Sequence, residues 1–366
     1  MAAVIEQLAK HDPDLTVRFV CDKAFETQSR GLMDQVGVPV TVSTISAGKF
    51  RRYAHLSKWQ HLTNWHVVSG NVGDITKIIV GFFQSLGLII RFWPDVVFAK
   101  GGYVCLPLGI AAWVLRRPLV IHDSDTRPGL TNRVLARFAT KIATGSPLEN
   151  YPYDPTKTTY AGVPISDAFR PATPEQQRDY KKELGVDPDK QLVVAMGGGL
   201  GSITINDAVA VAALKLQSDN VIIYNIAGKK NVERATKKAA GVDNYIAVPF
   251  VYEGMPKVLG AADMVVSRAS ATFLQELAGL KKTVIAVPAR QLGDQLKNAK
   301  VYEAAGAAVV LSDTDIETPD TLTATIKDLL SDAKKREALA EALHQFARPE
   351  AAADTAQLIV SAAKAK

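Results

Sequence analysis

Short apolar runs rich in valine and isoleucine alternate along this chain with longer stretches of helical periodicity. This alternation predicts parallel sheets that are covered by helices on both faces. In the first half the expected strands are Leu15–Cys21, Val96–Lys100, Leu119–His122, Lys141–Ala143 and Thr158–Ala161. In the second half they are Gln191–Met196, Val221–Ala227, Tyr245–Val248, Met264–Ser267, Thr283–Val287 and Ala307–Leu311. The pattern therefore predicts an α/β protein of two doubly wound, Rossmann-like domains.

A polar segment, 170–190, separates the two groups of strands. It contains Thr173-Pro174, which is typical of a helix start, and Gly185, which is typical of a helix stop. The expected parts of the chain are an N-terminal domain (1–161), a C-terminal domain (162–340) and a C-terminal helical segment (341–366) that packs back toward the N-terminal domain.

The composition narrows the class of protein. With 366 residues, 47% of them hydrophobic, the chain is long enough for two domains with buried cores. Its 43 Lys and Arg against 37 Asp and Glu leave a dispersed charge of +6, which does not indicate nucleic acid and suits an anionic substrate or an acidic membrane surface. Cys21 and Cys105 are too few for a disulfide framework or a thiolate metal site, as is typical of a reducing compartment.

The chain shows no secretory signal, because its first residues form an amphipathic pattern without a basic start or a cleavage site. Its most apolar stretch, Ile78–Trp93, is interrupted by Gln84 and Arg91 and is shorter than the roughly 18 residues that a membrane span needs. We therefore expect a soluble protein or one bound peripherally to the cytoplasmic face of the plasma membrane.

The strongest chemical signal is a glycine-rich turn. The expected strand 191–196 runs directly into the sequence GGGLGS (197–202), and a helical stretch follows. Glycines let the backbone approach a ligand closely, and a helix N-terminus presents free N–H groups and partial positive charge to a phosphate. The turn predicts a site for a nucleotide diphosphate; the alternative is a tight turn without a ligand.

Two common nucleotide-binding classes fit poorly. A dinucleotide fold requires G-x-G-x-x-G spacing and an acidic residue after the next strand, but that strand ends in Asn225, Ile226 and Ala227. A phosphate-binding P-loop is also absent, because Gly228-Lys229 has no upstream glycine at the required spacing and is followed by Lys230.

Two further polar clusters follow expected strand ends. The segment RASAT (268–272) precedes Glu276, whose carboxylate is suited to accept two hydrogen bonds from a ribose diol, although an acid early in a helix is also a common surface residue. Gln295 and Asn298 lie three residues apart and so share one helix face.

Together these segments resemble the MurG family, the N-acetylglucosaminyltransferases that act on lipid I in peptidoglycan synthesis. GGGLGS resembles G-G-S-x-G-A, RASATFLQE (268–276) resembles R-S-G-A-x-T-x-x-E, and GDQLKNA (293–299) resembles D-x-Q-x-x-N-A. In the first half, PDVVFAKGGYVCLP (94–107) resembles P-D-V-V-x-x-x-G-G-Y-x-x-x-P, and HDSDTRPGLTNRVLARFA (122–139) resembles H-E-Q-N-x-x-x-G-L-T-N-x-x-L. The similarity covers nearly the whole chain.

The resemblance implies a glycosyltransferase-B fold and an inverting transfer of N-acetylglucosamine from its UDP donor to lipid I, which forms lipid II. It places Gly199 and its neighbours at the diphosphate, Val251 beside the uracil, Glu276 at the ribose and Gln295 at the sugar. The implied residues of the UDP-sugar site are Asp125, Ser166, Gly198, Gly199, Gly201, Val251, Arg268, Ala271, Thr272, Phe273, Leu274, Gln275, Glu276, Gln295 and Asn298. Those on the lipid acceptor side are Gly101, Gly102, Tyr103, Thr131 and Asn132.

No cofactor is expected, and the resemblance implies metal-independent activity. Asp123-Ser124-Asp125 is a D-x-D string, which chelates a divalent metal in another glycosyltransferase fold. Its match to H-E-Q-N is the preferred interpretation.

Several positions depart from the family pattern. The family opens with a strand and a G-G-T-G-G-H loop whose histidine is the favoured general base, whereas this sequence begins at the helix that follows, so we expect an N-terminally truncated chain. Ser166 stands where an arginine is common, and Gly199 where the family has serine. The general base is therefore unknown; His122 and Asp125 are the candidates, and the alternative for His122 is a buried histidine with local hydrogen bonds.

The apolar stretch also suggests a membrane contact. Positive residues in nearby segments would rim an apolar face that binds an anionic membrane surface, although such a helix is often part of a core. The apolar residues are Ile78, Ile79, Phe82, Phe83, Leu86, Ile89, Ile90 and Trp93, and the basic ones are Lys77, Arg91, Arg116, Arg117, Arg133 and Arg137.

Two other functions remain open. One is a transferase of the same superfamily with a diacylglycerol or sterol acceptor. The other is a catalytically impaired homologue that binds the UDP-sugar and acts as a scaffold among cell-wall synthesis proteins.

Overall fold

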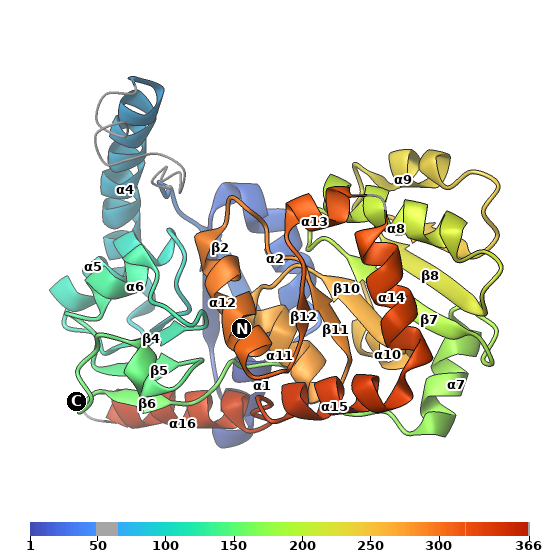
Figure 1. The fold of residues 1–366 in the computed structure, drawn as a ribbon. Coiled ribbons are helices and arrows are strands. Elements are labelled where there is room, and N and C mark those ends of the chain that lie inside the picture. The colour runs from blue at the N-terminus through green and yellow to red at the C-terminus, as the bar shows by residue number, and fades with distance from the viewer. Residues whose placement is uncertain (49–64, 319, 365–366) are drawn as a thin grey trace. The chain divides into compact units, whose positions relative to one another are not determined.

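The computed structural model describes residues 1–48, 65–318 and 320–364, and the chain divides into two compact units. Unit 1 comprises Met1–Ser166 and Arg348–Lys366, and unit 2 comprises Asp167–Ala347. Both boundaries lie a few residues later in the chain than the sequence suggested. Within the described residues, unit 1 contains two parallel sheets and unit 2 contains one (Figure 1). Each unit has its own hydrophobic core.

Unit 1 contains a two-stranded parallel sheet, β1-β2, and a four-stranded parallel sheet in the order β3-β4-β5-β6. The strands are β1 Val17–Cys21, β2 Val40–Thr44, β3 Val97–Ala99, β4 Leu119–Asp123, β5 Lys141–Thr144 and β6 Thr158–Tyr160. The helices are α1 Ala2–His11, α2 Glu26–Met33, α4 Trp65–Phe92, α5 Cys105–Val114, α6 Leu130–Leu135 and α16 Ala351–Lys364, with short 3-10 turns at Lys23–Phe25 and Leu148–Asn150.

Strand β4 shows why this unit forms two layers of helices. Leu119 and Ile121 pack on one face of the sheet with residues of α4 and α5, whereas Val120 packs on the other face with Ile359 of α16. Because successive side chains of a strand point to opposite faces, a continuous apolar run requires cover on both sides. The C-terminal helix α16 supplies part of that cover and packs along α1, β4 and β5.

Unit 2 is a six-stranded parallel sheet in the order β12-β11-β10-β7-β8-β9. The strands are β7 Gln191–Met196, β8 Val221–Ile226, β9 Tyr245–Val248, β10 Met264–Ser267, β11 Val284–Ala286 and β12 Val309–Val310. The helices are α7 Pro174–Glu183, α8 Ile203–Lys215, α9 Val232–Lys238, α10 Met255–Ala261, α11 Ala271–Gly279, α12 Gly293–Ala304, α13 Asp313–Glu317, α14 Thr321–Ser331 and α15 Ala333–His344.

The order of these strands identifies the ligand-binding edge of unit 2. The chain runs outward from β7 to β8 and β9, and then returns to β10 on the other side of β7. In open α/β sheets, ligands bind outside the carboxyl ends of the strands at such a reversal. The predicted doubly wound fold is confirmed, and its switch point lies between β7 and β10.

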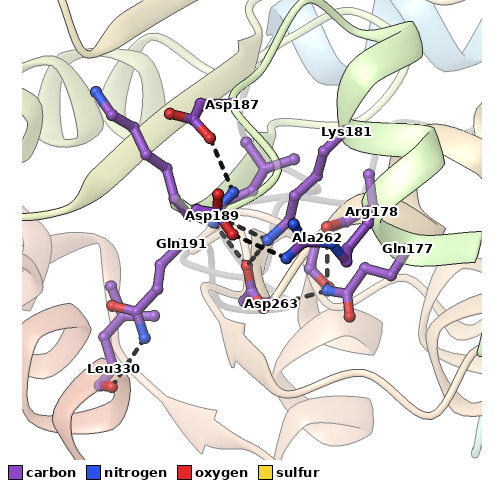
Figure 2. Close-up of polar contacts among 12 residues, drawn as sticks. Gln177, Arg178, Lys181, Asp187, Asp189, Gln191, Ala262, Asp263 and Leu330 are labelled. Carbon is purple, nitrogen blue, oxygen red and sulfur yellow. Dashed lines mark hydrogen bonds and ion pairs between the residues drawn. The ribbon is translucent and has the colours of Figure 1, made fainter. Parts of the chain in front are cut away.

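The opposite, amino-terminal edge of unit 2 carries a polar cluster around the buried Lys181 (Figure 2). Helix α7 begins with the predicted Thr173 cap, whose hydroxyl accepts a hydrogen bond from the Gln176 N–H. Farther along α7, Lys181 donates to Asp263 Oδ2 at 2.8 Å, and the main-chain N–H of Leu192 donates to the same oxygen at 2.7 Å. Asp263 thereby ties α7 to the starts of β7 and β10.

Helix α4 projects from the rest of unit 1 (Figure 1). Its segment Gly73–Phe92 has a mean hydropathy of 1.6 and is only 17% buried, so by length and composition it meets the requirement for crossing a membrane. The prediction that no stretch of the chain is apolar and long enough to span a membrane was therefore wrong. Gln84 and Arg91 interrupt the apolar run, but the mean hydropathy of the segment stays high. A single helix of this kind is weak evidence for a membrane span.

Candidate active site

The polar segments singled out in unit 2 meet at the carboxyl edge of its sheet. The GGGLGS turn follows β7, Arg268 follows β10, and Gln295 lies on α12 after β11. Strands β7, β10 and β11 are neighbours in the sheet, so these segments lie side by side at the switch point. The structure therefore brings together the three clusters that the sequence placed separately along the chain.

The glycine turn requires glycine at three positions: a Cβ atom on Gly197 would clash with the Ser202 main-chain nitrogen, and two further glycines have positive φ angles. Gly198 and Gly201 have φ angles of +86° and +77°, and the Gly201 N–H donates to the Gly198 carbonyl at 2.9 Å. A Cβ atom on Gly201 would meet the Ala227 carbonyl oxygen. Gly199 lies exposed at the tip of the turn, with open space where a Cβ atom would be.

Helix α8 starts at the end of this turn. Ser202 is its N-cap residue, and the Ser202 Oγ accepts a hydrogen bond of 3.4 Å from the main-chain N–H of Ile205. An N-capped helix start that follows a glycine turn is a suitable site for a phosphate, because its N–H groups and dipole favour negative charge.

The guanidinium of Arg268 lies against this helix start. Its Nη2 donates to Ser202 Oγ at 2.6 Å, and its Nη1 donates to Asp313 Oδ1 at 2.7 Å and to the Val287 carbonyl at 3.0 Å. The side chains of Arg268 and Asp313 are only 11% and 10% exposed. Asp313 was not among the predicted residues, although an acidic residue just after an expected strand is a usable signal.

The N-terminal end of helix α11 lies at the candidate site, but most of its side chains are buried. Ala271 is its first residue, and Thr272 and Glu276 are half-buried. By contrast, three predicted contacts have buried side chains, because α11 is buried around most of its circumference. Phe273 and Leu274 belong to the hydrophobic core, and Gln275 donates to the Tyr302 hydroxyl at 3.1 Å. Their contact with the donor stays a prediction.

The remaining predicted residues of unit 2 hold loops at the same edge. Gln295 Oε1 accepts a hydrogen bond from the Ala289 N–H at 3.0 Å, and the buried Asn298 donates to the Ala269 carbonyl at 3.2 Å. Half-buried Val251 follows β9 between two exposed aromatic residues, Phe250 and Tyr252, whose rings are 4.8 Å apart.

In unit 1 the predicted acceptor-side residues lie around the ends of β3 and β4. Gly101 and Gly102 have φ angles of +79° and +87°, and a Cβ atom on Gly101 would approach the buried amide of Asn132 to 3.0 Å. Asn132 itself donates to the His122 carbonyl at 3.0 Å. The Tyr103 hydroxyl donates to Asp22 at 3.2 Å, and burial together with this carboxylate raises the pKa of the tyrosine.

Two other predicted residues of unit 1 are partly accessible. Thr131 is the half-buried second residue of α6. Ser166 is half-buried and ends the first segment of the unit.

His122 is fully buried at 0% exposure. One ring nitrogen lies 2.8 Å from the Gly162 carbonyl and the other 3.2 Å from Ser124 Oγ. Burial, reinforced by the positive charge of Lys100, lowers the pKa of His122 to about 3. This geometry matches the alternative interpretation, a histidine that ends a buried strand and is bonded locally.

The D-x-D string does not present two matching carboxylates. Asp123 is 3% exposed and accepts a hydrogen bond of 2.7 Å from the Tyr153 hydroxyl, whereas Asp125 is half-buried and its carbonyl accepts one of 2.6 Å from Tyr151. Burial raises the pKa of Asp123 to about 7. Within the described ranges, no group of three or more His, Cys, Asp or Glu side chains is arranged to hold a metal ion.

Comparison with known proteins assigns the family. The model of the glycosyltransferase family 28 N-terminal domain matches residues 1–144, and that of its C-terminal domain matches residues 192–355. The UDP-N-acetylglucosamine–N-acetylmuramyl-(pentapeptide) pyrophosphoryl-undecaprenol N-acetylglucosamine transferase of Geobacillus kaustophilus is 37% identical over 296 residues, which are 80% of this chain and 76% of that protein. The protein of the same name from Geobacillus thermodenitrificans is 34% identical over 330 residues, 89% of this chain and 85% of that one. The chain belongs to the MurG family.

The predicted family and the predicted class of enzyme, a glycosyltransferase, are thus confirmed. The crystal structure of Acinetobacter baumannii MurG matches 98% of this chain and 96% of its own, with a TM-score of 0.70 and 22% identity. That likeness supports the glycosyltransferase-B fold expected from the MurG resemblance.

Proposed function

We propose that this chain transfers N-acetylglucosamine from UDP-N-acetylglucosamine to the muramyl sugar of undecaprenyl-linked lipid I, with inversion, and so forms lipid II. The observation that carries the proposal is the glycine turn 197–202, which runs into the capped start of α8 at the switch point of unit 2. This is the place and the chemistry that a nucleotide diphosphate requires. The relatives named for this reaction support the choice of sugar and acceptor.

In this proposal the edge of unit 2 holds the UDP-sugar. The turn and the start of α8 bind the diphosphate, the backbone near Val251 faces the uracil, and Glu276 accepts hydrogen bonds from the ribose. Gln295, whose carbonyl oxygen is engaged by Ala289 N–H, retains its amide hydrogens to donate to the sugar. We propose that the reaction needs no metal, since the helix start supplies the positive end that the diphosphate needs.

We further propose that α4 docks unit 1 on an anionic membrane surface, where the lipid acceptor resides. One side of α4 is buried and the other is exposed. Ile89 packs into the core, whereas Ile79, Phe83 and Ile90 are more than half exposed. Exposed Trp93 lies at its end, with the Arg117 guanidinium 4.4 Å above the ring. An apolar face with cations at its border suits the boundary between acyl chains and acidic head groups.

The test is transfer of radiolabelled N-acetylglucosamine from UDP to a lipid I analogue in the presence of EDTA. We expect labelled lipid II, and an undiminished rate in EDTA. Diacylglycerol and sterol acceptors are assayed in parallel, and their use in place of lipid I would favour the other lipid glycosyltransferase. Binding of UDP-N-acetylglucosamine without transfer to any acceptor would favour the scaffold alternative.

A matched pair of variants tests the ribose contact. Glu276→Gln should raise the KM for UDP-N-acetylglucosamine by about tenfold, because a charged acceptor of two hydrogen bonds becomes a neutral one. Glu233→Gln removes an exposed carboxylate on α9 and serves as the control. Equal KM values for the two variants would contradict the role of Glu276.

A further inference from the structure

One guanidinium connects the ends of four adjacent strands in unit 2. Arg268 follows β10, and its three hydrogen bonds reach Ser202 after β7, Val287 after β11 and Asp313 after β12. These strands are consecutive in the sheet order β12-β11-β10-β7. Arg268 therefore acts as a cross-brace along the edge where the glycine turn lies.

The position of Arg268 is itself determined by Asp313. The two side chains form an ion pair at 2.7 Å, and the second oxygen of Asp313 accepts the Arg290 main-chain N–H at 3.1 Å. Because both partners are about nine-tenths buried, the positive charge of Arg268 is largely neutralised where it lies. These contacts orient the guanidinium toward Ser202.

The hydroxyl of Ser202 then has a defined orientation. A serine oxygen has two acceptor lone pairs and one hydrogen to donate. Arg268 Nη2 and the Ile205 N–H both donate to this oxygen, so its lone pairs are occupied and the hydroxyl hydrogen is left to donate. A phosphate oxygen, which only accepts, is the complementary group.

We propose that Ser202 donates its hydroxyl hydrogen to the diphosphate of the UDP-sugar, and that Asp313 is a positioning residue that acts through Arg268 to hold Ser202 in this orientation. In this arrangement Arg268 braces the turn from behind and does not itself bind the phosphate. The sequence offers a parallel: the family pattern G-G-S-x-G-A has serine third and alanine sixth, whereas GGGLGS has Gly199 third and Ser202 sixth. This chain therefore has its hydroxyl three residues after the position where the family pattern has one. The inference rests on the proposed function, because it assumes that a UDP-sugar binds at this turn.

The test compares variants by the Kd for UDP, measured by calorimetry, and by KM and kcat for UDP-N-acetylglucosamine. Ser202→Ala should weaken UDP binding and raise KM by about tenfold, the effect of losing one hydrogen bond to a charged group, with little change in kcat. Ser202→Thr retains the hydroxyl and should restore binding. The decisive variant is Gly199→Ser with Ser202→Ala, which returns the serine to the family position and should also recover the Kd.

Asp313→Asn tests the positioning role. Like Ser202→Ala, it should raise the Kd for UDP. The double variant Arg268→Ala with Asp313→Ala should have a Kd for UDP no higher than that of Arg268→Ala alone. The control is Asp263→Asn, which breaks the Lys181 ion pair at the other end of β10 (Figure 2). It should lower Tm but leave the Kd for UDP unchanged, so a loss of binding cannot be ascribed to destabilisation alone.

Each outcome decides between the claims. A wild-type chain that does not bind UDP would contradict the proposed function, and this inference with it. A wild-type chain that binds UDP while Ser202→Ala binds equally well would overturn the inference alone. Failure of Gly199→Ser to rescue Ser202→Ala would assign Ser202 to helix capping only. Tighter binding by Asp313→Asn would show that a freed Arg268 contacts the phosphate directly.

Discussion

The hydroxyl of Tyr153 donates a hydrogen bond of 2.7 Å to Oδ2 of Asp123 at the end of β4. Burial raises the pKa of Asp123 to about 7, and the bonds from Tyr153 and Asn132 offset only part of that effect. In the unfolded chain this carboxyl ionises near its ordinary value of 3.8. Between these two pH values the folded state therefore binds more protons than the unfolded state, so the contribution of Asp123 to stability is complete below pH 4 and is lost as the pH rises through 7.

The first prediction concerns this pH dependence. The stability of the wild-type chain relative to Asp123→Asn should be greater at pH 5 than at pH 8, by about 2–3 kcal/mol. Urea unfolding followed by circular dichroism at both pH values measures it. Tyr153→Phe removes a hydrogen bond that lowers the pKa of Asp123. The stabilising contribution of Asp123 should then be lost at a higher pH than in the wild type. A difference between wild type and Asp123→Asn that is the same at both pH values would refute the prediction.

The second prediction concerns the thiols. Cys105 donates from Sγ to the Gly101 carbonyl at 2.8 Å, and burial raises its pKa to about 12, while Cys21 is 6% exposed. Because the thiolate is the reactive form, Cys105 should react with a disulfide reagent about 10³-fold more slowly than a free thiol at pH 8. Absorbance on addition of the reagent measures the rate, and both thiols should react at once in guanidinium chloride. Rapid labelling of the folded chain would count against it.

A third prediction concerns the glycine turn. Gly201→Ala places a Cβ atom against the Ala227 carbonyl at a φ of +77° and should destabilise unit 2 by about 1–3 kcal/mol. Gly199→Ala is the matched control for folding, because no atom of the described residues lies within 4 Å of its Cβ position. Thermal unfolding compares the two. Equal Tm values would mean that the turn relaxes without cost.

The fourth prediction concerns membrane docking. Phe83→Asp places a charge on the outward face of α4, where Phe83 is 65% exposed, and should reduce binding to vesicles of acidic phospholipid by about tenfold or more. Leu214→Asp, at a residue 58% exposed on α8 of unit 2, is the control and should bind as wild type does. Vesicle sedimentation gives both values. The idea fails if the two variants bind alike.

Local pattern was enough to determine most of the elements. Each of the eleven strands expected from the sequence has a counterpart in the structure. Strands such as β11 are readable because a strand buried on both faces must be continuously apolar. Strand β2 was missed: Val40–Thr44 alternates valine with threonine and serine, and among the described strands it pairs with β1 alone. The capping residue of α7 was also readable, because Thr173 and Gln176 bond within one turn.

Only the tertiary structure decided how the residues of the site are used. The sequence located the glycine turn, since its spacing and glycines are local properties of the chain. It did not reveal that Arg268 pairs with Asp313, 45 residues later, because the two meet only when β10, β11 and β12 align. The sequence also could not show how His122 is used. Its ring nitrogen bonds to the Gly162 carbonyl, which lies 40 residues later in the chain. Turns and helix caps depend on residues adjacent in the sequence, whereas burial and side-chain pairing depend on the packing of residues that are distant in the sequence.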